Sequence, residues 1–360
     1  MRIQIETIQE GFTKTHCWCQ SNIGVLDGLA VLITQQLKLS GSDVFGLIHS
    51  RYSKDEAKTF SQLTEQPGMH IGERIVTDVE LTAHKKSGVL LAIGIGFLYK
   101  GDDPLKPELE EALVSAYSVY DPINNRFLRA KRPVYTDGTP IENIFSGHAQ
   151  RVNLDNGDIL QPLIRKIKEP ECKYYAAIMR FGFDGETLVH KETGAELYLN
   201  HEARGIMEPS LTEYKGKYYI TLRTESKGYM AVSDDGLHYG EIKPWLWDTG
   251  YEVPTYNTQQ HWLKGKNGLY LVYTRRNGKN DHVFRNRAPL YMAKLDLENL
   301  CLLRHTEQIL TPERGARMGN FGAVHINEDE SWVLSTEWMQ PVGCEKYGSN
   351  NAIYLTRIFW

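Results

Sequence analysis

The chain has few cysteines, little helical periodicity and no long apolar run. Its five cysteines in 360 residues are a sparse and odd-numbered set, which favours a reducing compartment. No apolar stretch approaches the roughly 20 residues that a membrane-spanning helix needs. Only residues 105–114 have the pattern of a short helix, read as an insertion in a loop. The sequence therefore excludes a helical fold and a chain that crosses a bilayer.

The chain also lacks an excess of charge of one sign. Its formal net charge is -4, and the two signs are interspersed, so nothing predicts binding to nucleic acid or to an anionic membrane. The first ten residues, MRIQIETIQE, have the pattern of a strand and lack the basic-then-apolar layout of a secretion signal. The expected location is the cytoplasm, or a secreted or periplasmic one if a leader has been removed. The oligomeric state is not indicated.

The chain does contain a sixfold repeat. An apolar run, a turn and a second apolar run recur about every 50 to 70 residues, a period typical of repeat architectures. The turns lie near Asp27, Lys86, Asn156, Gly216, Asn267 and Glu328. An outer strand marked by aspartate follows most hairpins, which makes each unit a four-stranded blade. The sequence therefore predicts one all-β domain over residues 1–360, a six-bladed β-propeller of four-stranded antiparallel blades.

The two ends of the chain are expected to share a blade. After the sixth hairpin only residues 352–360, AIYLTRIFW, have the pattern of a strand, and the leading strand RIQIETI has no hairpin partner. We predict that the N-terminal strand closes the last blade, because this pairing also removes exposed sheet edges. The aspartates of YSKDEAKTF and VSDDGLHY are expected to stabilise tight turns far from the axis.

A propeller places the beginnings of its inner strands around one axial pocket. Counting back seven positions from each turn gives polar residues in every blade. They are Gln20, Asp78, His148, Glu208 or Pro209, residues 257–260 including Asn257 and Gln260, and Asn320 with Phe321. Carboxylates, a histidine and amides around one pocket have the composition of a catalytic or binding site. The alternative is that these groups only line a water-filled channel.

Glu208 and Arg223 are expected to meet at the mouth of this pocket. Glu208 begins the fourth hairpin, and Arg223 ends its second strand, so hairpin geometry returns the arginine to the level of the glutamate. Such a pair is either a positioned ion pair or part of a clamp for a carboxylate. Among the arginines after the fifth hairpin, Arg287 is expected to point inward, whereas Arg275 and Arg276 are as well explained by a solvated loop.

These residues resemble the sialidase (neuraminidase) superfamily of six-bladed propellers. YSKDEAKTF and VSDDGLHY are similar to its Asp-box (BNR) repeats without matching the full consensus. EPSLTEYKGKYYITLRT is similar to one hairpin of the family. In the family, that hairpin carries the glutamate that pairs with the catalytic tyrosine. It also carries one arginine of the triad that binds the substrate carboxylate. The resemblance gives these roles to Glu208 and Arg223, and RAPLYMAKLD implies a second triad arginine at Arg287. Asp43 lies where the family keeps its acid/base aspartate.

Two departures from the family argue against ordinary neuraminidase activity. HCWCQSN, at the first hairpin, has no triad arginine, and RMGNFGAVH, at the sixth, has Asn320 and Phe321 where the nucleophilic tyrosine is expected. A phenylalanine has no hydroxyl group with which to attack a sugar. The chain is therefore similar to a divergent member of the superfamily.

Two enzymatic routes and one non-catalytic role remain open. In the first route, a pair of carboxylates hydrolyses a glycoside at a glycan terminus, possible members being Asp43, Asp78, Glu208 and Glu337. In the second, His148 or His16 moves a proton while arginines neutralise a uronate, as in a lyase or an unusual glycosidase. The third role is that of a glycan-binding propeller without turnover.

The candidate residues fall into two groups. Those expected to be catalytic are Asp43, Glu208, His148, His16 and Asp78. Those expected to bind substrate are Arg223, Arg287, Arg204, Gln20, Trp18, Asn257, Gln260, Asn320 and Glu337. No cofactor is expected, and no metal, because the histidine and cysteines of HCWC lack a second pair at zinc-site spacing. A glycoside hydrolase that binds carbohydrate is the leading interpretation.

Overall fold

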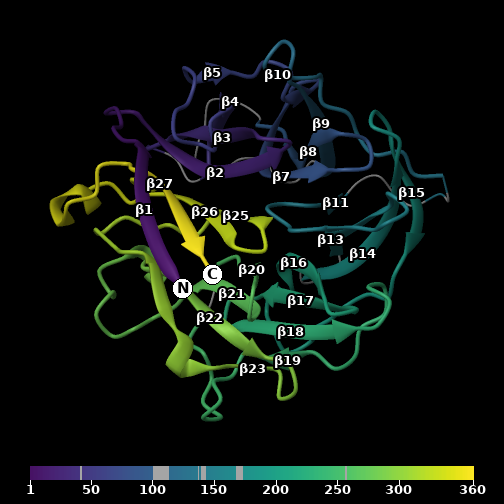
Figure 1. The fold of residues 1–360 in the computed structure, drawn as a ribbon, viewed down its shortest axis with the longest axis vertical. Coiled ribbons are helices and arrows are strands. Elements are labelled where there is room, and N and C mark those ends of the chain that lie inside the picture. Colours follow the sequence, from purple (N-terminus) through teal and green to yellow (C-terminus); the bar gives the residue numbers. More distant parts are fainter. Residues whose placement is uncertain (41–42, 100–112, 137, 139–142, 168–172, 256–257) are drawn as a thin grey trace.

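The structure is a computed structural model, which describes residues 1–40, 43–99, 113–136, 138, 143–167, 173–255 and 258–360. The described residues form 27 strands and three short 3-10 helices, and they include no α-helix. The strands lie in five sheets arranged around a central axis as a propeller (Figure 1). The predicted all-β class and the propeller arrangement are confirmed. Most of residues 105–114, expected as a short helix, lie outside the described residues.

The first sheet is a separate four-stranded blade. It contains β2 (His16–Leu26), β3 (Leu29–Lys38), β4 (Phe45–Ser53) and β5 (Thr64–Glu65). Asp27 and Gly28 connect β2 to β3, and both have positive φ, 48° and 82°. This conformation at both central residues is that of the two-residue hairpin turn favoured between twisted strands. The turn predicted at Asp27 is therefore present.

The next sheet has ten strands and covers the second and third expected blades. It contains β6 (His70–Ile71), β7 (Arg74–His84), β8 (Val89–Phe97), β9 (Val114–Asp121), β10 (Arg126–Phe127), β11 (Ile144–Phe145), β12 (Val152–Asn153), β13 (Ile159–Ile167), β14 (Lys173–Phe183) and β15 (Leu188–Thr193). The prediction of six separate blades is wrong at this point. The short β11 pairs parallel to β9, with Ile144 opposite Val114, and antiparallel to β13, so it joins the two groups of strands.

The fourth and fifth hairpins each begin a separate sheet. One contains β16 (Met207–Tyr214), β17 (Lys217–Arg223), β18 (Gly228–Ser233) and β19 (Lys243–Pro244). The other contains β20 (His261–Gly265), β21 (Gly268–Thr274), β22 (Leu290–Asp296), β23 (Cys301–Leu302) and β24 (Gln308–Thr311). The 3-10 helices η1 (Phe284–Asn286) and η2 (Arg304–Thr306) lie in the connections on either side of β22 and β23. Together with the first sheet and the last one, described next, these make four sheets of the ring that are separate blades.

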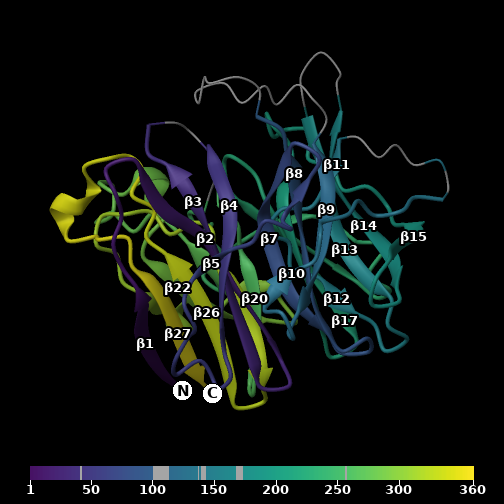
Figure 2. The same ribbon diagram turned by 90° about the horizontal axis from the view of Figure 1, so that it is seen from above.

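The last sheet joins the two ends of the chain. It contains β25 (Gly322–Asn327), β26 (Glu330–Thr336), β27 (Ile353–Phe359) and β1 (Arg2–Gln9), with η3 (Cys344–Tyr347) between β26 and β27. β1 pairs antiparallel with β27, from Arg2 opposite Phe359 onward. Figures 1 and 2 show both ends of the chain side by side. The predicted closure of the last blade by the N-terminal strand is confirmed.

The core lies between neighbouring blades. Val31 on β3, Leu81 on β7 and Leu90 on β8 are buried in one apolar cluster that joins the first sheet to the next. Burying a side chain of this size contributes roughly 1.5–3 kcal/mol. Gly24 on β2 permits this approach, because a Cβ there would lie 2.7 Å from Leu81 Cγ. The strands that carry the candidate site are held in place by this packing.

The aspartate-marked segments are outer turns that their aspartates stabilise. Asp55 accepts hydrogen bonds from Ser53 Oγ at 2.6 Å and Thr59 Oγ1 at 2.6 Å. Asp235 accepts from Ser233 Oγ at 2.9 Å and from the backbone N–H of Leu237 at 2.8 Å. These turns lie between the third and fourth strands of their sheets, away from the inner strands.

No helix in the described part of the chain is both long and apolar enough to cross a bilayer.

Candidate functional site

Four of the residues found by counting back from the turns share one unusual backbone conformation. Gln20, Asp78, His148 and Glu208 have φ of 52°, 50°, 43° and 43°. Positive φ is uncommon outside glycine and asparagine, and it costs conformational energy. On β2, β7 and β16 the ladder shifts register at this residue, as at a β-bulge. The bulges change the direction of these side chains, and the contacts below show that they form one group.

Asp78 joins the first, second and last sheets. Its Oδ1 accepts hydrogen bonds from Gln20 Nε2 at 2.5 Å and, at 3.5 Å, from Asn320 Nδ2. Gln20 Oε1 in turn accepts from the backbone N–H of Asp78 at 3.0 Å. Burial raises the pKa of Asp78 well above its usual value, and the charges of Glu208 and Asp43 raise it further. The group is therefore biased toward the protonated acid, which can donate a hydrogen bond to a ligand.

Glu208 and Arg223 form the expected ion pair. Arg223 Nη1 lies 2.6 Å from Glu208 Oε1, and the arginine side chain is 6% exposed. The pair forms because β16 and β17 are hairpin partners, with Met207 opposite Arg223. Glu208 Oε2 is buried without a hydrogen-bond partner among the described residues. One carboxylate oxygen is thus fixed by the arginine, and the other is left without a hydrogen bond from the described residues.

Two further arginines, Arg287 and Arg317, are buried, and Arg287 is near both Arg223 and Arg317. Arg287 precedes β22, and Arg317 precedes β25; both are less than a tenth exposed. Burial lowers the pKa of Arg287 far below its usual value, and the nearby positive charges of Arg223 and Arg317 lower it further. Gly319 leaves room for this arrangement, because a Cβ there would lie 2.5 Å from Arg287 Cδ. Mutual repulsion among three buried cations favours binding of an anion.

Arg317 was not predicted from the sequence. Its guanidinium lies 4.5 Å from the centre of the Trp338 ring, and Nη2 donates to Gln340 Oε1 at 3.0 Å. The signal for it was present, since it lies three residues before Asn320, at the beginning of the sixth hairpin. The first hairpin, where the resemblance puts the third arginine, has none. Arg317 instead lies near Arg287, at the beginning of the sixth hairpin.

Asp43 is near Asp78 and Arg317, and Phe321 replaces the tyrosine that would accompany it in the family. Its side chain is exposed, and its charge influences the pKa of both Asp78 and Arg317. Tyr99 Oη donates to Asp43 O at 2.7 Å, while burial raises the pKa of this phenol. Phe321, where the family has its nucleophile, is fully buried, with its ring packed edge-on against His261 at 4.9 Å. Phe321 therefore supplies no tyrosinate nucleophile at this position.

His148 lies deeper than the mouth and is next to a second buried histidine. It is 1% exposed, and neither ring nitrogen has a partner among the described residues. Burial lowers its pKa to about 4, against a smaller opposing effect of Glu208, so the ring is neutral at pH 7. His261 and Glu80 approach it, each offering one atom within 4.8 Å of the others. Glu80 and His261 were not predicted as site residues.

Several residues predicted to belong to the site make their contacts outside the axial group of Gln20, Asp78, His148 and Glu208. His16 Nδ1 lies 3.0 Å from Thr15 Oγ1, and His16 borders a separate cavity of about 200 Å³. The Trp18 ring, which borders the same cavity, packs edge-on against His49 at 5.1 Å. Arg204 is exposed and pairs with Glu225 at 2.7 Å. Asn257 lies outside the described residues.

Glu337 and Gln260 are both engaged in structural contacts. Glu337 is 1% exposed and receives two hydrogen bonds from Arg314, at 2.8 and 3.0 Å, as well as the hydroxyl of Tyr354 at 3.1 Å. Gln260 Oε1 accepts from Thr221 Oγ1 at 2.5 Å. These contacts hold the connection before β27 and join β17 to the chain before β20. Neither residue has a free polar atom directed at the mouth.

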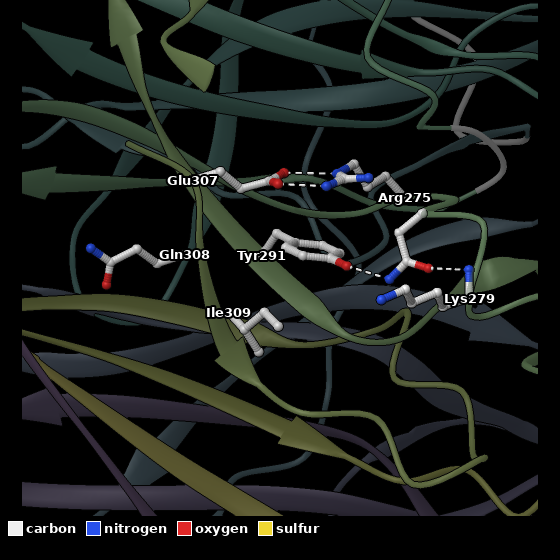
Figure 3. A pocket seen from close by; sticks show the side chains of 7 residues that line it. Arg275, Lys279, Tyr291, Glu307, Gln308 and Ile309 are labelled. Carbon is white, nitrogen blue, oxygen red and sulfur yellow. Dashed lines mark hydrogen bonds and ion pairs between the residues drawn. The ribbon is translucent and has the colours of Figure 1, made fainter. Parts of the chain in front are cut away.

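One cavity is separate from the axial group of Gln20, Asp78, His148 and Glu208. It has a volume of about 350 Å³ and lies beside β22 and β24 (Figure 3). Figure 3 shows Arg275 paired with Glu307 through two contacts, at 2.8 and 2.5 Å. Arg275 also lies over the Tyr291 ring at 4.6 Å. The solvated-loop interpretation of Arg275 is replaced by a structural ion pair, and this cavity contains none of the predicted catalytic residues.

The fold is similar to that of sialidases. A Trypanosoma rangeli sialidase in complex with sialic acid aligns with a TM-score of 0.62 and 13% identity, over 99% of this chain and 58% of that one. A Hadza microbial sialidase aligns with a TM-score of 0.65 and 10% identity, over 95% and 66%. This chain thus spans less than two thirds of the first sialidase and about two thirds of the second. At such identities the similarity shows the fold alone.

A protein of unknown function from Dyadobacter fermentans matches over the full length of both chains. Its TM-score is 0.71 and its identity 14%, with 99% of each chain covered. No family model matches the sequence, and no curated protein does. The comparisons therefore support a sialidase-like propeller, and the chemistry has to be argued from the side chains.

Proposed function

We propose that the protein is a glycoside hydrolase that acts on a glycan terminus carrying an acidic sugar. The observation that carries this proposal is the convergence of Glu208 and Asp43 with three buried arginines at one end of the ring. The ten-stranded sheet acts as two blades in this proposal, which completes a sixfold ring. Asp78 and His148, one from each half of that sheet, have the same bulge conformation as Gln20 and Glu208, which supports this division.

The arginines would bind the carboxylate of the substrate. Arg287 is near both Arg223 and Arg317, and an anion bound beside these three side chains would relieve the repulsion. Guanidinium groups pair with carboxylates through two parallel hydrogen bonds, which fixes orientation as well as charge. The sugar would thereby be held with its anomeric carbon near Glu208. Protonated Asp78 would donate a hydrogen bond to a sugar hydroxyl.

Hydrolysis would use Asp43 and Glu208 as the two carboxyl groups. Asp43, exposed at the mouth, donates its proton to the glycosidic oxygen as the bond from that oxygen to the anomeric carbon breaks. Glu208 Oε2 either attacks the anomeric carbon or accepts a proton from an attacking water. In both cases water supplies the hydroxyl group of the released sugar, and Asp43 is reprotonated. Arg223 holds Glu208 in position throughout.

One observation favours a second candidate, a glycan-binding propeller without turnover. Phe321 replaces the hydroxyl nucleophile of the family that the chain resembles, whereas the arginines remain. The histidine route has less support, because His148 is buried and His16 has its contacts in another cavity. The two candidates predict the same ligand and differ only in product formation.

The decisive experiment is product analysis with a panel of sialosides, arabinans and uronate-containing oligosaccharides. A hydrolase releases a saturated acidic monosaccharide from at least one member, and release is lost in Glu208→Gln. Saturable binding without any product would establish the glycan-binding candidate. An unsaturated uronate in the product would show a lyase and overturn the hydrolase. Neither binding nor turnover with any acidic glycan would contradict both candidates.

A further inference from the structure

Three buried side chains from separate inner segments meet near the axis of the ring. Glu80 lies on β7, His148 precedes β12, and His261 is the first residue of β20. One ligand atom from each lies within 4.8 Å of the other two, and all three residues are less than a twentieth exposed. Segments so distant in the chain bring these groups together only through closure of the ring. We propose that Glu80, His148 and His261 bind one divalent transition-metal ion, with zinc the best match.

The unpaired nitrogens of the two histidines are the main argument. His148 Nδ1 and Nε2 and His261 Nε2 have no hydrogen-bond partner among the described residues, although both rings are buried. A buried polar atom without a partner costs free energy, and most buried polar atoms in folded proteins are satisfied. Both rings offer lone pairs of neutral imidazole, the form in which histidine binds metals. A metal ion would satisfy one nitrogen of each ring at the same time.

The outer partners orient two of the proposed ligands. His261 Nδ1 lies 2.6 Å from Ser210 Oγ, and Ser210 Oγ also accepts the backbone N–H of Gln150 at 3.4 Å. With His261 Nδ1–H donating to this oxygen, Nε2 presents its lone pair to the site. Asn22 Nδ2 donates to Glu80 Oε2 at 2.6 Å and fixes that carboxylate. Metal-binding histidines and carboxylates commonly have such outer contacts.

The donor set selects the kind of ion. Two imidazoles and one carboxylate suit zinc or a similar transition metal, whereas calcium and magnesium prefer oxygen ligands. Zinc binds such ligand atoms at about 2.0–2.2 Å in a tetrahedron, which puts the ligand atoms about 3.4 Å apart. The three atoms, which lie within 4.8 Å of one another, therefore need to approach by at most about 1.4 Å. Three protein ligands leave the fourth tetrahedral position for a water molecule or another small ligand. The competing explanation is that one buried water bridges the three side chains.

The test measures zinc directly in the full-length protein. The chain is incubated with a chelator, then with Zn²⁺, separated from unbound metal, and its metal content is measured by mass spectrometry. We expect about one zinc per chain and a rise in Tm on adding Zn²⁺, as for any ligand of the folded state. His261→Gln should abolish tight binding, and Ser210→Ala should weaken it by about 10- to 100-fold. Zinc content at background level in the unmodified protein would overturn the proposal.

His238→Gln is the matched control for zinc bound at the surface. His238 is exposed and pairs with Asp235 at 2.7 Å, which is the kind of surface pair that takes up zinc non-specifically. This variant should bind as much zinc as the unmodified protein, and a loss equal to that in His261→Gln would contradict the assignment. If His261→Gln does not fold, anomalous diffraction at the zinc edge from the unmodified protein decides the matter. A peak between the three side chains supports the site, and a water without anomalous signal refutes it.

Discussion

Arg223 Nη1 and Glu208 Oε1 lie 2.6 Å apart, at the ends of two strands that pair across a single hairpin. The arginine is almost fully buried, and the second carboxylate oxygen has no partner among the described residues. A pair that served only stability would have both oxygens satisfied, as Glu337 does with Arg314 and its neighbours. The Glu208–Arg223 and Glu337–Arg314 pairs therefore differ in how completely the carboxylate is satisfied, as a functional and a structural pair would.

Glu208→Gln should abolish turnover with little loss of binding. The amide keeps the size of the side chain but cannot attack or accept a proton, so we expect kcat to fall by about 10²- to 10⁴-fold. Initial rates with the active glycan and binding by calorimetry measure the two effects separately. Glu213→Gln, on the same strand at the outer turn, is the matched control and should retain full activity. A Glu208→Gln variant with normal kcat would remove this residue from the chemistry.

Asp43→Asn tests the proton donor. Asparagine cannot protonate the leaving oxygen, so substrates with poor leaving groups should lose about 10²- to 10⁴-fold in kcat. Aryl glycosides with good leaving groups need little protonation, and they should lose much less. Rates for a series of leaving groups in both proteins measure this difference. An equal loss for every leaving group would instead indicate a structural role for Asp43.

Arg317→Gln should weaken binding of acidic ligands. A hydrogen bond to a charged group contributes about 1.5–3 kcal/mol, so we expect Kd to rise by about 10- to 150-fold. A neutral analogue of the same sugar should bind the two proteins equally. Arg276→Gln is the control, since that arginine pairs with Asp281 at 2.6 Å on the surface. If the acidic and neutral ligands are affected alike, Arg317 does not contact the carboxylate.

Gly24→Ala should destabilise the protein through a steric clash. The added Cβ would lie 2.7 Å from Leu81 Cγ in the core between the first and second sheets. Overpacking of this kind costs about 1–3 kcal/mol in the free energy of unfolding. Gly46→Ala on β4 is the matched control, because its nearest neighbour, Gln36 Cβ, is at an ordinary 3.4 Å. Denaturant titration of the two variants measures the difference, and equal stabilities would refute the packing argument.

Asp158 should make the protein less stable in acid. Burial opposes its ionisation, but Lys191 and Arg180, both at 2.7 Å, outweigh that effect and hold its pKa below the usual value. A carboxyl group with a lowered pKa stabilises the folded state above its unfolded pKa of about 3.9, and this contribution is lost as the pH falls through the folded pKa. Thermal unfolding between pH 7 and pH 2 tests this prediction.

Asp158→Asn should lower Tm at pH 7 and converge with the unmodified protein at the acid end. The exposed Asp155 lies in the same turn, and Asp155→Asn should leave the pH profile unchanged. A constant difference between Asp158→Asn and the unmodified protein at every pH would mean that the ion pairs do not titrate as argued. The contribution of Asp158 would then come from neutral hydrogen bonds.

The sequence predicted the ring and four members of the axial group because both depend on local periodicity. Turn spacing located Gln20, Asp78, His148 and Glu208, and hairpin pairing located Arg223. It did not predict the joining of two blades through β11, which depends on a single parallel residue pair between distant segments. The position of Arg317 near the sixth hairpin was readable from the sequence, but its approach to Arg287 and that of Glu80 to His261 were not. Their proximity is set by how the blades pack, and no spacing along one strand encodes it.

The pairing of β1 with β27 has a consequence for how the pocket is assembled during folding. Ile5 lies opposite Thr356, so this contact joins segments separated by almost the whole chain, and contacts of this kind form slowly. The sheet that contains them also includes β25, which directly follows Arg317 and Asn320. We expect a late intermediate in which most blades are folded while the ring is still open. Such an intermediate would have native-like strands but bind ligand poorly, because Asp78 would still lack its contact with Asn320 from the far end of the chain.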